Sequence, residues 1–141
     1  MKVTKVILSR GRHDTITTHK ILTDFDLVVP QSELNKYKDV VTNANNIIPI
    51  PDNVEGLGAV RNWTLDHYDS EVVIMFDDDI SHFYSLLNMK AEKIKDKDLI
   101  NTIILNCASN CIEAKASVFS FNQVKGDIRK YRHTDPFNLK T

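Results

Sequence analysis

The sequence is poor in residues that mark several classes of protein. Only two of its 141 residues are cysteine, four are glycine and four are proline. With 42% hydrophobic and 26% charged residues, the composition excludes a fibre or a disordered chain and is that of one globular domain with a core of ordinary size. Cys107 and Cys111 lie one helical turn apart without further cysteine or a nearby histidine at ligand spacing, which argues against a zinc site. We expect both to be reduced thiols in the core.

The chain also lacks an excess of charge and a long apolar run. Its formal net charge of −1 gives no overall attraction to nucleic acid or acidic lipid, so a local patch would have to hold a polyanionic partner. The first nine residues contain only a short apolar stretch at 6–8, too brief for a signal sequence, and no later run approaches a membrane span. These absences predict a cytoplasmic protein with no membrane partner.

Short apolar runs alternate with helical stretches along the chain. Strands are predicted at residues 3–8, 25–29, 46–51, 71–76 and 118–122. Helices are predicted at residues 14–22, at 33–41, after the glycine-containing loop that begins at Val54, and at 99–114. This alternation predicts a single α/β domain over residues 1–141, with a mainly parallel sheet flanked by helices. Ligands of such sheets collect beyond the carboxyl ends of the strands.

Three aspartates, Asp77, Asp78 and Asp79, directly follow the fourth predicted strand. If the chain stays extended, Asp77 and Asp79 point to one side and Asp78 to the other. Adjacent carboxylates repel one another, a divalent cation relieves that repulsion, and oxygen ligands favour Mg²⁺ or Mn²⁺ over zinc. The alternative is a solvated turn in which one aspartate caps a helix at residues 80–87.

The order of the motifs carries a family resemblance. Ser-Arg-Gly-Arg ends the first strand at residues 9–12, Gly-Leu-Gly-Ala-Val-Arg-Asn-Trp opens a helix at 56–63, and Phe-Asp-Asp-Asp ends a strand at 76–79. This order resembles the nucleotide-sugar half of a GT-A type (Rossmann-like) glycosyltransferase, over roughly residues 3–85. Phe-Ser-Phe-Asn-Gln at 119–123 and Pro-Phe-Asn-Leu at 136–139 are similar to phage glycosyltransferases associated with TET-type base oxygenases.

The resemblance implies a function and a set of site residues. It implies a hexosyltransferase that uses Mn²⁺ or Mg²⁺ and a nucleoside diphosphate sugar, with a UDP-sugar as the expected donor and hydroxymethylated bases in DNA as the acceptor. A phage-encoded protein of this kind would act in the host cytoplasm. The nucleotide-sugar residues carried over by motif are Ser9, Arg10, Arg12, Arg61, Asn62, Asp77 and Asp78. The metal ligands carried over are Asp79, as first choice, and Asp77.

The chemistry of sugar transfer fits these residue types. A departing diphosphate gains negative charge as the sugar becomes cationic, and a divalent cation with arginines stabilises that charge. Guanidinium groups also bind phosphate oxygens in a fork. The alternatives are that Arg10 and Arg12 are solvated loop residues and that Arg61 pairs with a surface acid.

The resemblance assigns no residues of this chain to an acceptor site. Proteins of this type are longer, so the fold is expected to be truncated after its donor half, with exposed apolar surface and self-association as consequences. No catalytic base is assigned, and His82 is expected on a helix surface rather than at the metal. The basic segment at residues 125–140 either contacts DNA or is a solvated face.

Two other functions compete with sugar transfer. A noncatalytic α/β module that binds nucleotide or protein fits the short length. A nucleotidyltransferase or phosphohydrolase would also use acidic metal ligands, but the glycine-rich signature with a lysine near the first strand is absent. The sugar, the nucleotide base and the stereochemical outcome are not encoded in a readable motif.

Overall fold

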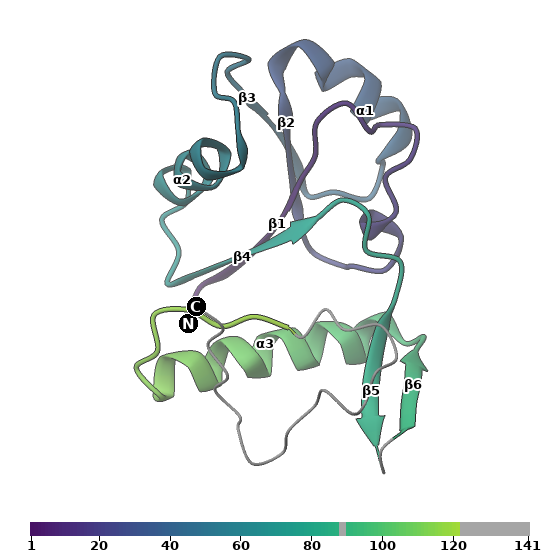
Figure 1. The fold of residues 1–141 in the computed structure, drawn as a ribbon, viewed down its shortest axis with the longest axis vertical. Coiled ribbons are helices and arrows are strands. Elements are labelled where there is room, and N and C mark those ends of the chain that lie inside the picture. The colour runs from purple at the N-terminus through teal and green to yellow at the C-terminus, as the bar shows by residue number, and fades with distance from the viewer. Residues whose placement is uncertain (88–89, 122–141) are drawn as a thin grey trace.

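The computed structural model describes residues 1–87 and 90–121 (Figure 1). Within this part the main sheet is parallel and has the strand order β3-β2-β1-β4. Its strands are β1 (Val3–Leu8), β2 (Asp26–Pro30), β3 (Asn46–Ile50) and β4 (Val72–Asp77). The apolar runs therefore form the predicted parallel sheet, and the α/β fold class is confirmed.

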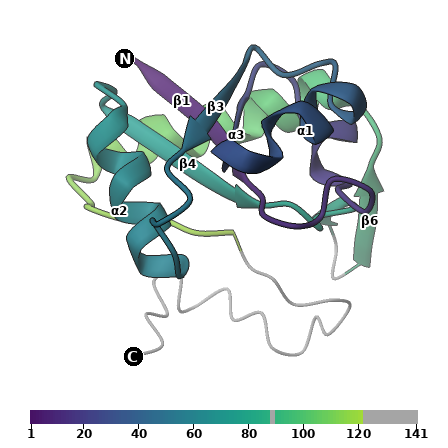
Figure 2. The ribbon, with the colours of Figure 1, turned by 90° about the horizontal axis from the view of Figure 1, so that it is seen from above.

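Helices cover both faces of this sheet. The 3₁₀ turns are η1 (Thr18–Lys20) and η2 (Gln31–Glu33). The helices α1 (Leu34–Val40), α2 (Leu57–His67) and α3 (Lys97–Glu113) form where three of the four predicted helices were expected. The views in Figures 1 and 2 place α2 apart from α1 and α3. Buried contacts agree, since Tyr37 of α1 and Ile104 of α3 belong to one core cluster, whereas Val60 and Trp63 of α2 pack on another.

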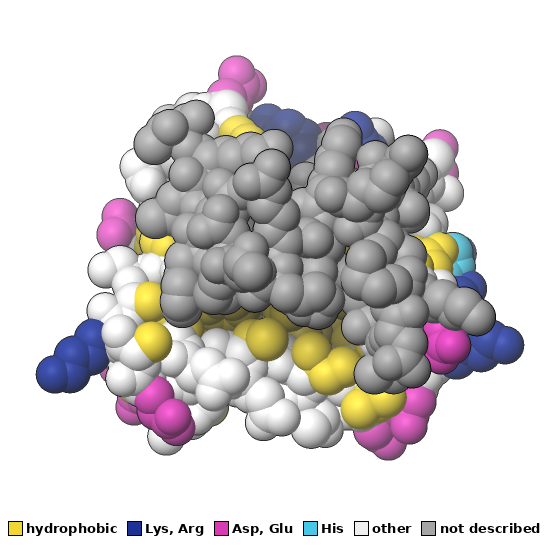
Figure 3. Space-filling model, turned by 60° about the horizontal axis from the view of Figure 1, so that its bottom comes forward, with side chains coloured by type: hydrophobic (Ala, Val, Ile, Leu, Met, Phe, Trp, Pro, Cys, Tyr) yellow, Lys and Arg dark blue, Asp and Glu magenta, His cyan; other side chains and the backbone are white. Residues whose placement is uncertain are grey.

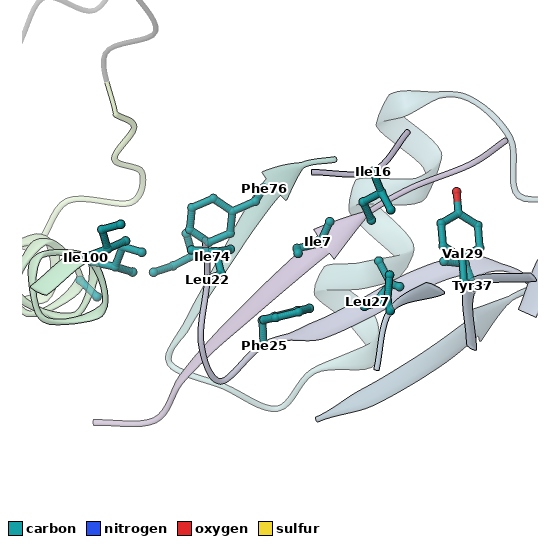
Figure 4. Close-up of a cluster of buried hydrophobic side chains, with 13 residues drawn as sticks. Ile7, Ile16, Leu22, Phe25, Leu27, Val29, Tyr37, Ile74, Phe76 and Ile100 are labelled. Carbon is teal, nitrogen blue, oxygen red and sulfur yellow. The ribbon is translucent and has the colours of Figure 1, made fainter. Parts of the chain in front are cut away.

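The alternation of side chains along β1 explains the two clusters. Ile7 faces α1 and α3 and lies among aromatic and aliphatic side chains drawn in Figure 4. Val6 faces α2. Lys5, on the same face as Ile7, is 3% exposed and donates hydrogen bonds to the carbonyl of Thr23 and the side chain of Asn101 in α3. A buried ammonium needs such partners, so β1 and α3 are joined by polar as well as apolar contacts.

The strand register brings two loops together at the carboxyl edge of the sheet. Leu8 lies beside Val28 of β2 and beside Asp77 of β4. The next residue, Ser9, donates its backbone N–H to the carbonyl of Val28 at 3.1 Å. The loop after β1 and the turn after β4 therefore start side by side at the carboxyl edge of the sheet, which is the edge where a ligand was predicted to bind.

The helix predicted at residues 14–22 is wrong, because only η1 forms there. The backbone N–H groups of Thr17 and Thr18 donate to the carbonyl of Asp78, at 2.9 and 3.2 Å. Ile16 and Leu22 are still buried as the pattern required. A contact some 60 residues away in sequence thus overrides the local helical preference.

The alternative of a helix at residues 80–87 is also wrong. Instead β5 (Phe83–Leu87) pairs antiparallel with β6 (Lys90–Ile94) in a two-stranded sheet. Phe83 lies edge-on to Phe76, with ring centroids 6.5 Å apart. That packing and the pairing with β6 favour an extended chain, which suits aromatic residues. His82 consequently lies in the loop before β5 and not on a helix surface.

The strand predicted at residues 118–122 does not form over 118–121, and Asn122 lies outside the described residues. Phe119 and Phe121 contact each other edge-on, with centroids 5.8 Å apart, and both pack against the core cluster that holds α3. The aromatic pair is partly buried by side-chain packing, since no described strand pairs with this segment.

Helix α3 carries the two cysteines and part of an apolar surface. Cys107 and Cys111 are free thiols, as predicted, but both are only half-buried and not in the core. Burial raises the pKa of Cys107. Hydrophobic side chains are exposed on the side of the molecule where α3 lies (Figure 3), and Leu99 and Ile112 of α3 are 47% and 41% exposed. Self-association through such a surface stays a prediction. No described helix has the length and apolar character needed to cross a membrane.

Candidate functional site

The acidic turn, residues 77–79, is held by hydrogen bonds to η1. Strand β4 ends at Asp77, and Asp78 and Asp79 lie in a turn. The hydroxyl of Thr18, which is fully buried, donates to the carbonyl of Asp77 at 2.6 Å and accepts from the N–H of Ile80 at 2.9 Å. Since its N–H also bonds to the carbonyl of Asp78, Thr18 fixes the backbone at both ends of the turn.

Asp78 is the buried member of the triplet, and its carboxylate accepts hydrogen bonds from Ser9 and Arg12. It is 7% exposed, and Oδ2 accepts from the hydroxyl of Ser9 at 2.6 Å. Ser9 thereby uses its only proton, so the hydroxyl of Tyr37, 2.6 Å away, donates to Ser9. Tyr37 in turn accepts from the backbone N–H of Arg12 at 3.1 Å. Burial raises the pKa of Tyr37, which keeps its phenol protonated and able to donate.

The side chain of Arg12 closes this network. Its Nη1 lies 3.1 Å from Oδ1 of Asp78 and 3.4 Å from Oδ2 of Asp79. The charge of Asp78, first, and the hydrogen bond to it raise the pKa of Arg12. Two carboxylates of the triplet therefore converge on one positively charged group.

Asp77 lies apart from this pair. It is exposed, and its Oδ1 is 3.8 Å from Nη2 of Arg61 in α2. Arg61 does pair with an acid, as the alternative reading held, but that acid is one of the triplet. Because the strand ends at Asp77, the strict alternation expected over the three aspartates stops there, and Asp79 shares its arginine with Asp78.

A hollow of about 250 Å³ opens at the carboxyl edge of the sheet, between β1, β2, β3 and the start of α2. We call it the edge hollow. Its polar lining comes from Ser9, Arg10 and Asp78. Its other lining residues are Leu8, Val28, Pro30, Ile50, Gly56, Leu57 and Val60. Apolar walls with a few polar groups at one end are typical of small-molecule sites.

Arg10 and Gly56 shape the mouth of the edge hollow. Arg10 donates to the carbonyl of Val54 at 2.8 Å and lies 3.8 Å from Glu55. Gly56 precedes the first residue of α2 with a φ of 85°, a conformation that a side chain at Cβ would strain. The N-terminus of α2, an end that favours anions, thus begins at the rim of the hollow.

Of the eight predicted site residues, the structure brings six to this edge of the sheet, joins a seventh to them by an ion pair and leaves one outside the contacts. Those at the edge are Ser9, Arg10, Arg12, Asp77, Asp78 and Asp79, with Arg61 reaching Asp77 from α2. Asn62 is exposed on α2, and no hydrogen bond of its side chain occurs within the described residues. Tyr37 and Thr18 were missed, because neither stands in a motif and only the folded chain brings them to the acidic turn.

No group of three or more histidine, cysteine, aspartate or glutamate side chains gathers as a metal centre among residues 1–87 and 90–121. The two carboxylates that share Arg12 fit an ion such as Mg²⁺, which takes one or two carboxylates and completes its shell with water and substrate phosphates. The basic segment at 125–140, predicted to contact DNA or solvent, lies outside the described residues.

Comparison with known proteins gives one family. The family model described as TET-Associated Glycosyltransferase matches residues 3–136. No curated protein and no solved structure matches the chain. The match covers the loop after β1, α2 and the acidic turn together, so it includes every residue of the candidate site.

Proposed function

Because this chain belongs to the TET-associated glycosyltransferase family, we propose that it binds a nucleoside diphosphate sugar, with a UDP-sugar as the first candidate, at the carboxyl edge of its sheet. In the transfer, the bond between the anomeric carbon and the diphosphate oxygen breaks, and the electron pair leaves with the diphosphate. A bond forms from the anomeric carbon to the oxygen of an acceptor hydroxyl, whose proton passes to the solvent. The proposed acceptor is a hydroxymethylated base in DNA.

One observation carries the donor site: a cationic and acidic cluster borders a mostly apolar hollow at the ligand edge of a parallel sheet. The apolar lining of the edge hollow suits a nucleoside. Arg10 lines the hollow, and Arg12 reaches its Asp78 wall. Their guanidinium groups suit the diphosphate, whose charge grows as the sugar leaves.

Asp78 and Asp79 are the proposed ligands of Mn²⁺ or Mg²⁺. They already share one positive partner, Arg12, whereas Asp77 is engaged by Arg61. This pairing supports Asp79 as the first metal ligand, as the motif implied, and favours Asp78 over Asp77 as the second. When bound, such an ion would neutralise charge on the departing diphosphate.

Calorimetric titration with UDP and GDP, with and without Mn²⁺, tests the donor site. We expect diphosphate binding that depends on Mn²⁺ and is lost in Asp79→Ala. The matched control is Asp66→Ala, which removes an exposed carboxylate from α2. Equal binding by wild type, Asp79→Ala and Asp66→Ala would refute the site.

Incubation of donor, Mn²⁺ and hydroxymethylated DNA, followed by mass spectrometry, tests the transfer. We expect a hexose mass shift on the DNA. Donor binding without a shift on any hydroxymethylated DNA would overturn DNA as the acceptor and favour the noncatalytic binding module.

A further inference from the structure

A second hollow is lined in part by the residues that follow the acidic turn and is rich in lysine. Its volume is about 220 Å³. Its lining residues are Lys20, Ile21, Ser81, His82, Lys93, Ile94, Lys95, Lys97 and Ile100. No aspartate or glutamate is among them. We call it the basic hollow.

The four lysines of the basic hollow come from three elements, η1, the β6 region and the start of α3. None of them forms an ion pair within residues 1–87 and 90–121, whereas Arg10 of the edge hollow and Arg12 and Arg61 beside the acidic turn are all paired. Glu92, Asp96 and Asp98 adjoin these lysines in sequence, but no ion pair forms between them and the lysines in the described part of the chain, and Asp96 caps α3 by accepting from the N–H groups of Asp98 and Leu99 at 2.9 and 3.2 Å. The lysine charges are therefore left for a ligand.

The positive charge of these lysines affects a neighbouring histidine. His19 of η1 is 8% exposed, and its Nδ1 is a buried nitrogen with no partner among the described residues. Burial, first, and the charges of Lys20 and Lys97 lower its pKa. Protonation of His19 is therefore disfavoured, as expected for a histidine beside a cluster of lysines.

The acidic turn connects the two hollows. Asp78 lines the edge hollow, and Ser81 and His82, a few residues further along, line the basic hollow. From the opposite side, Lys20 follows Thr18, whose hydroxyl holds the turn. A ligand in the basic hollow would consequently lie next to the proposed site of sugar transfer.

An aromatic side chain adjoins the lysines. Tyr84 of β5 is 55% exposed, its ring centroid is 6.1 Å from that of His82, and it pairs in register with Lys93. Lysines beside exposed aromatic rings are typical of nucleic-acid surfaces, where cations contact phosphates and rings stack on bases. A lipid headgroup would use the lysines but not the ring.

We infer that the basic hollow binds the phosphodiester backbone of a nucleic-acid strand through Lys20, Lys93, Lys95 and Lys97, with Tyr84 against a base. This deepens the proposed function and rests on it in one respect, since the bound strand would be the acceptor. It assigns backbone binding to lysines beside the acidic turn, independently of any contact from residues 125–140.

Fluorescence anisotropy with a labelled single-stranded oligonucleotide tests the inference on the full chain. The variant is Lys93→Gln/Lys95→Gln, and the control is Lys36→Gln/Lys38→Gln, which removes two exposed lysines from α1. We expect the first variant to bind about tenfold more weakly at low salt and to lose about 1.4 from the slope of log K against log salt, because each phosphate contact contributes about 0.7. The control should bind like wild type.

Other outcomes would overturn the inference. Equal binding by wild type and both variants removes the basic hollow as the site, even if DNA is the acceptor. Binding of wild type to vesicles of phosphatidylcholine and phosphatidylserine but not to oligonucleotide would assign it to lipid. If wild type binds no oligonucleotide, the inference fails, and Mn²⁺-dependent UDP binding, measured on the same sample, decides separately whether the donor site stands.

Discussion

Replacing Thr18 with valine should loosen the acidic turn without changing the packing around it. Valine has nearly the same shape as threonine, but it lacks the hydroxyl that donates to the carbonyl of Asp77 at 2.6 Å and accepts from the N–H of Ile80 at 2.9 Å. Thr18 is fully buried, so water cannot easily replace the lost partner. A Thr18→Val variant therefore isolates the contribution of this one oxygen atom.

The magnitude follows from the two bonds. A typical hydrogen bond contributes about 1 kcal/mol, and a buried group left without a partner costs about 1–3 kcal/mol. With two backbone groups affected, we expect the free energy of unfolding to fall by about 3 kcal/mol. At about 3–4 °C per kcal/mol for a domain of this size, Tm should fall by about 10 °C. The variant should still fold, because domains are commonly stable by about 5–15 kcal/mol.

Urea unfolding followed by the fluorescence of the only tryptophan, Trp63, measures this change. The control is Thr17→Val, since the hydroxyl of Thr17 is only half-buried and makes longer contacts, 3.2 Å to the carbonyl of Ile80 and 3.5 Å to that of Asp78. We expect the control to lose less than about 1 kcal/mol. Equal losses in the two variants would refute the view that Thr18 holds the turn.

Three further substitutions test the network, the pH response and the core. Tyr37→Phe keeps the buried ring but removes the hydroxyl between Ser9 and Arg12, so it should lower the free energy of unfolding by about 2 kcal/mol in urea titration, and an unchanged midpoint would contradict the network. The pKa of His19 is lowered by burial and two nearby lysines. The unfolded chain therefore takes up the proton at a higher pH than the folded chain does, and stability should fall as pH drops below about 6.5. In His19→Asn the decline of Tm between about pH 7 and 5.5 should be shallower, and identical slopes in the variant and wild type would contradict the role of His19. Ile104→Ala removes a side chain that is 1% exposed and should lower the free energy of unfolding, measured by calorimetry, by about 2–5 kcal/mol. A negligible loss would contradict the packing of α3 on the sheet.

The sequence predicted the sheet and its ligand edge well because the signals are local. Each strand is a short apolar run, and the ends of these runs place Ser9 and Asp77 at the same edge. Parallel pairing then follows from the alternation of strands and helices. These local signals were enough to predict the sheet edge where the residues of the proposed donor site lie.

The parts that sequence reasoning missed depend on contacts between distant segments. Residues 14–22 carry a helical pattern, but Thr17 and Thr18 bind the acidic turn instead. Residues 90–94 consist largely of helix formers, yet they form β6 because β5 supplies a pairing partner. The basic hollow was therefore missed as well, since η1 and β6 each contribute lysines to it.

The position of β1 in the sheet has a consequence for the order of folding. This first strand pairs on one side with β2 and on the other with β4, where Val3 meets Val72. The hydroxyl of Ser9 and the carboxylate of Asp78 are 69 residues apart in the chain, and contacts of such long range close slowly. This bond requires β4 to lie beside β1, so it reports the docking of β4 on the sheet. A donor bound there would stabilise the state in which β4 has docked, by an amount set by its concentration relative to Kd.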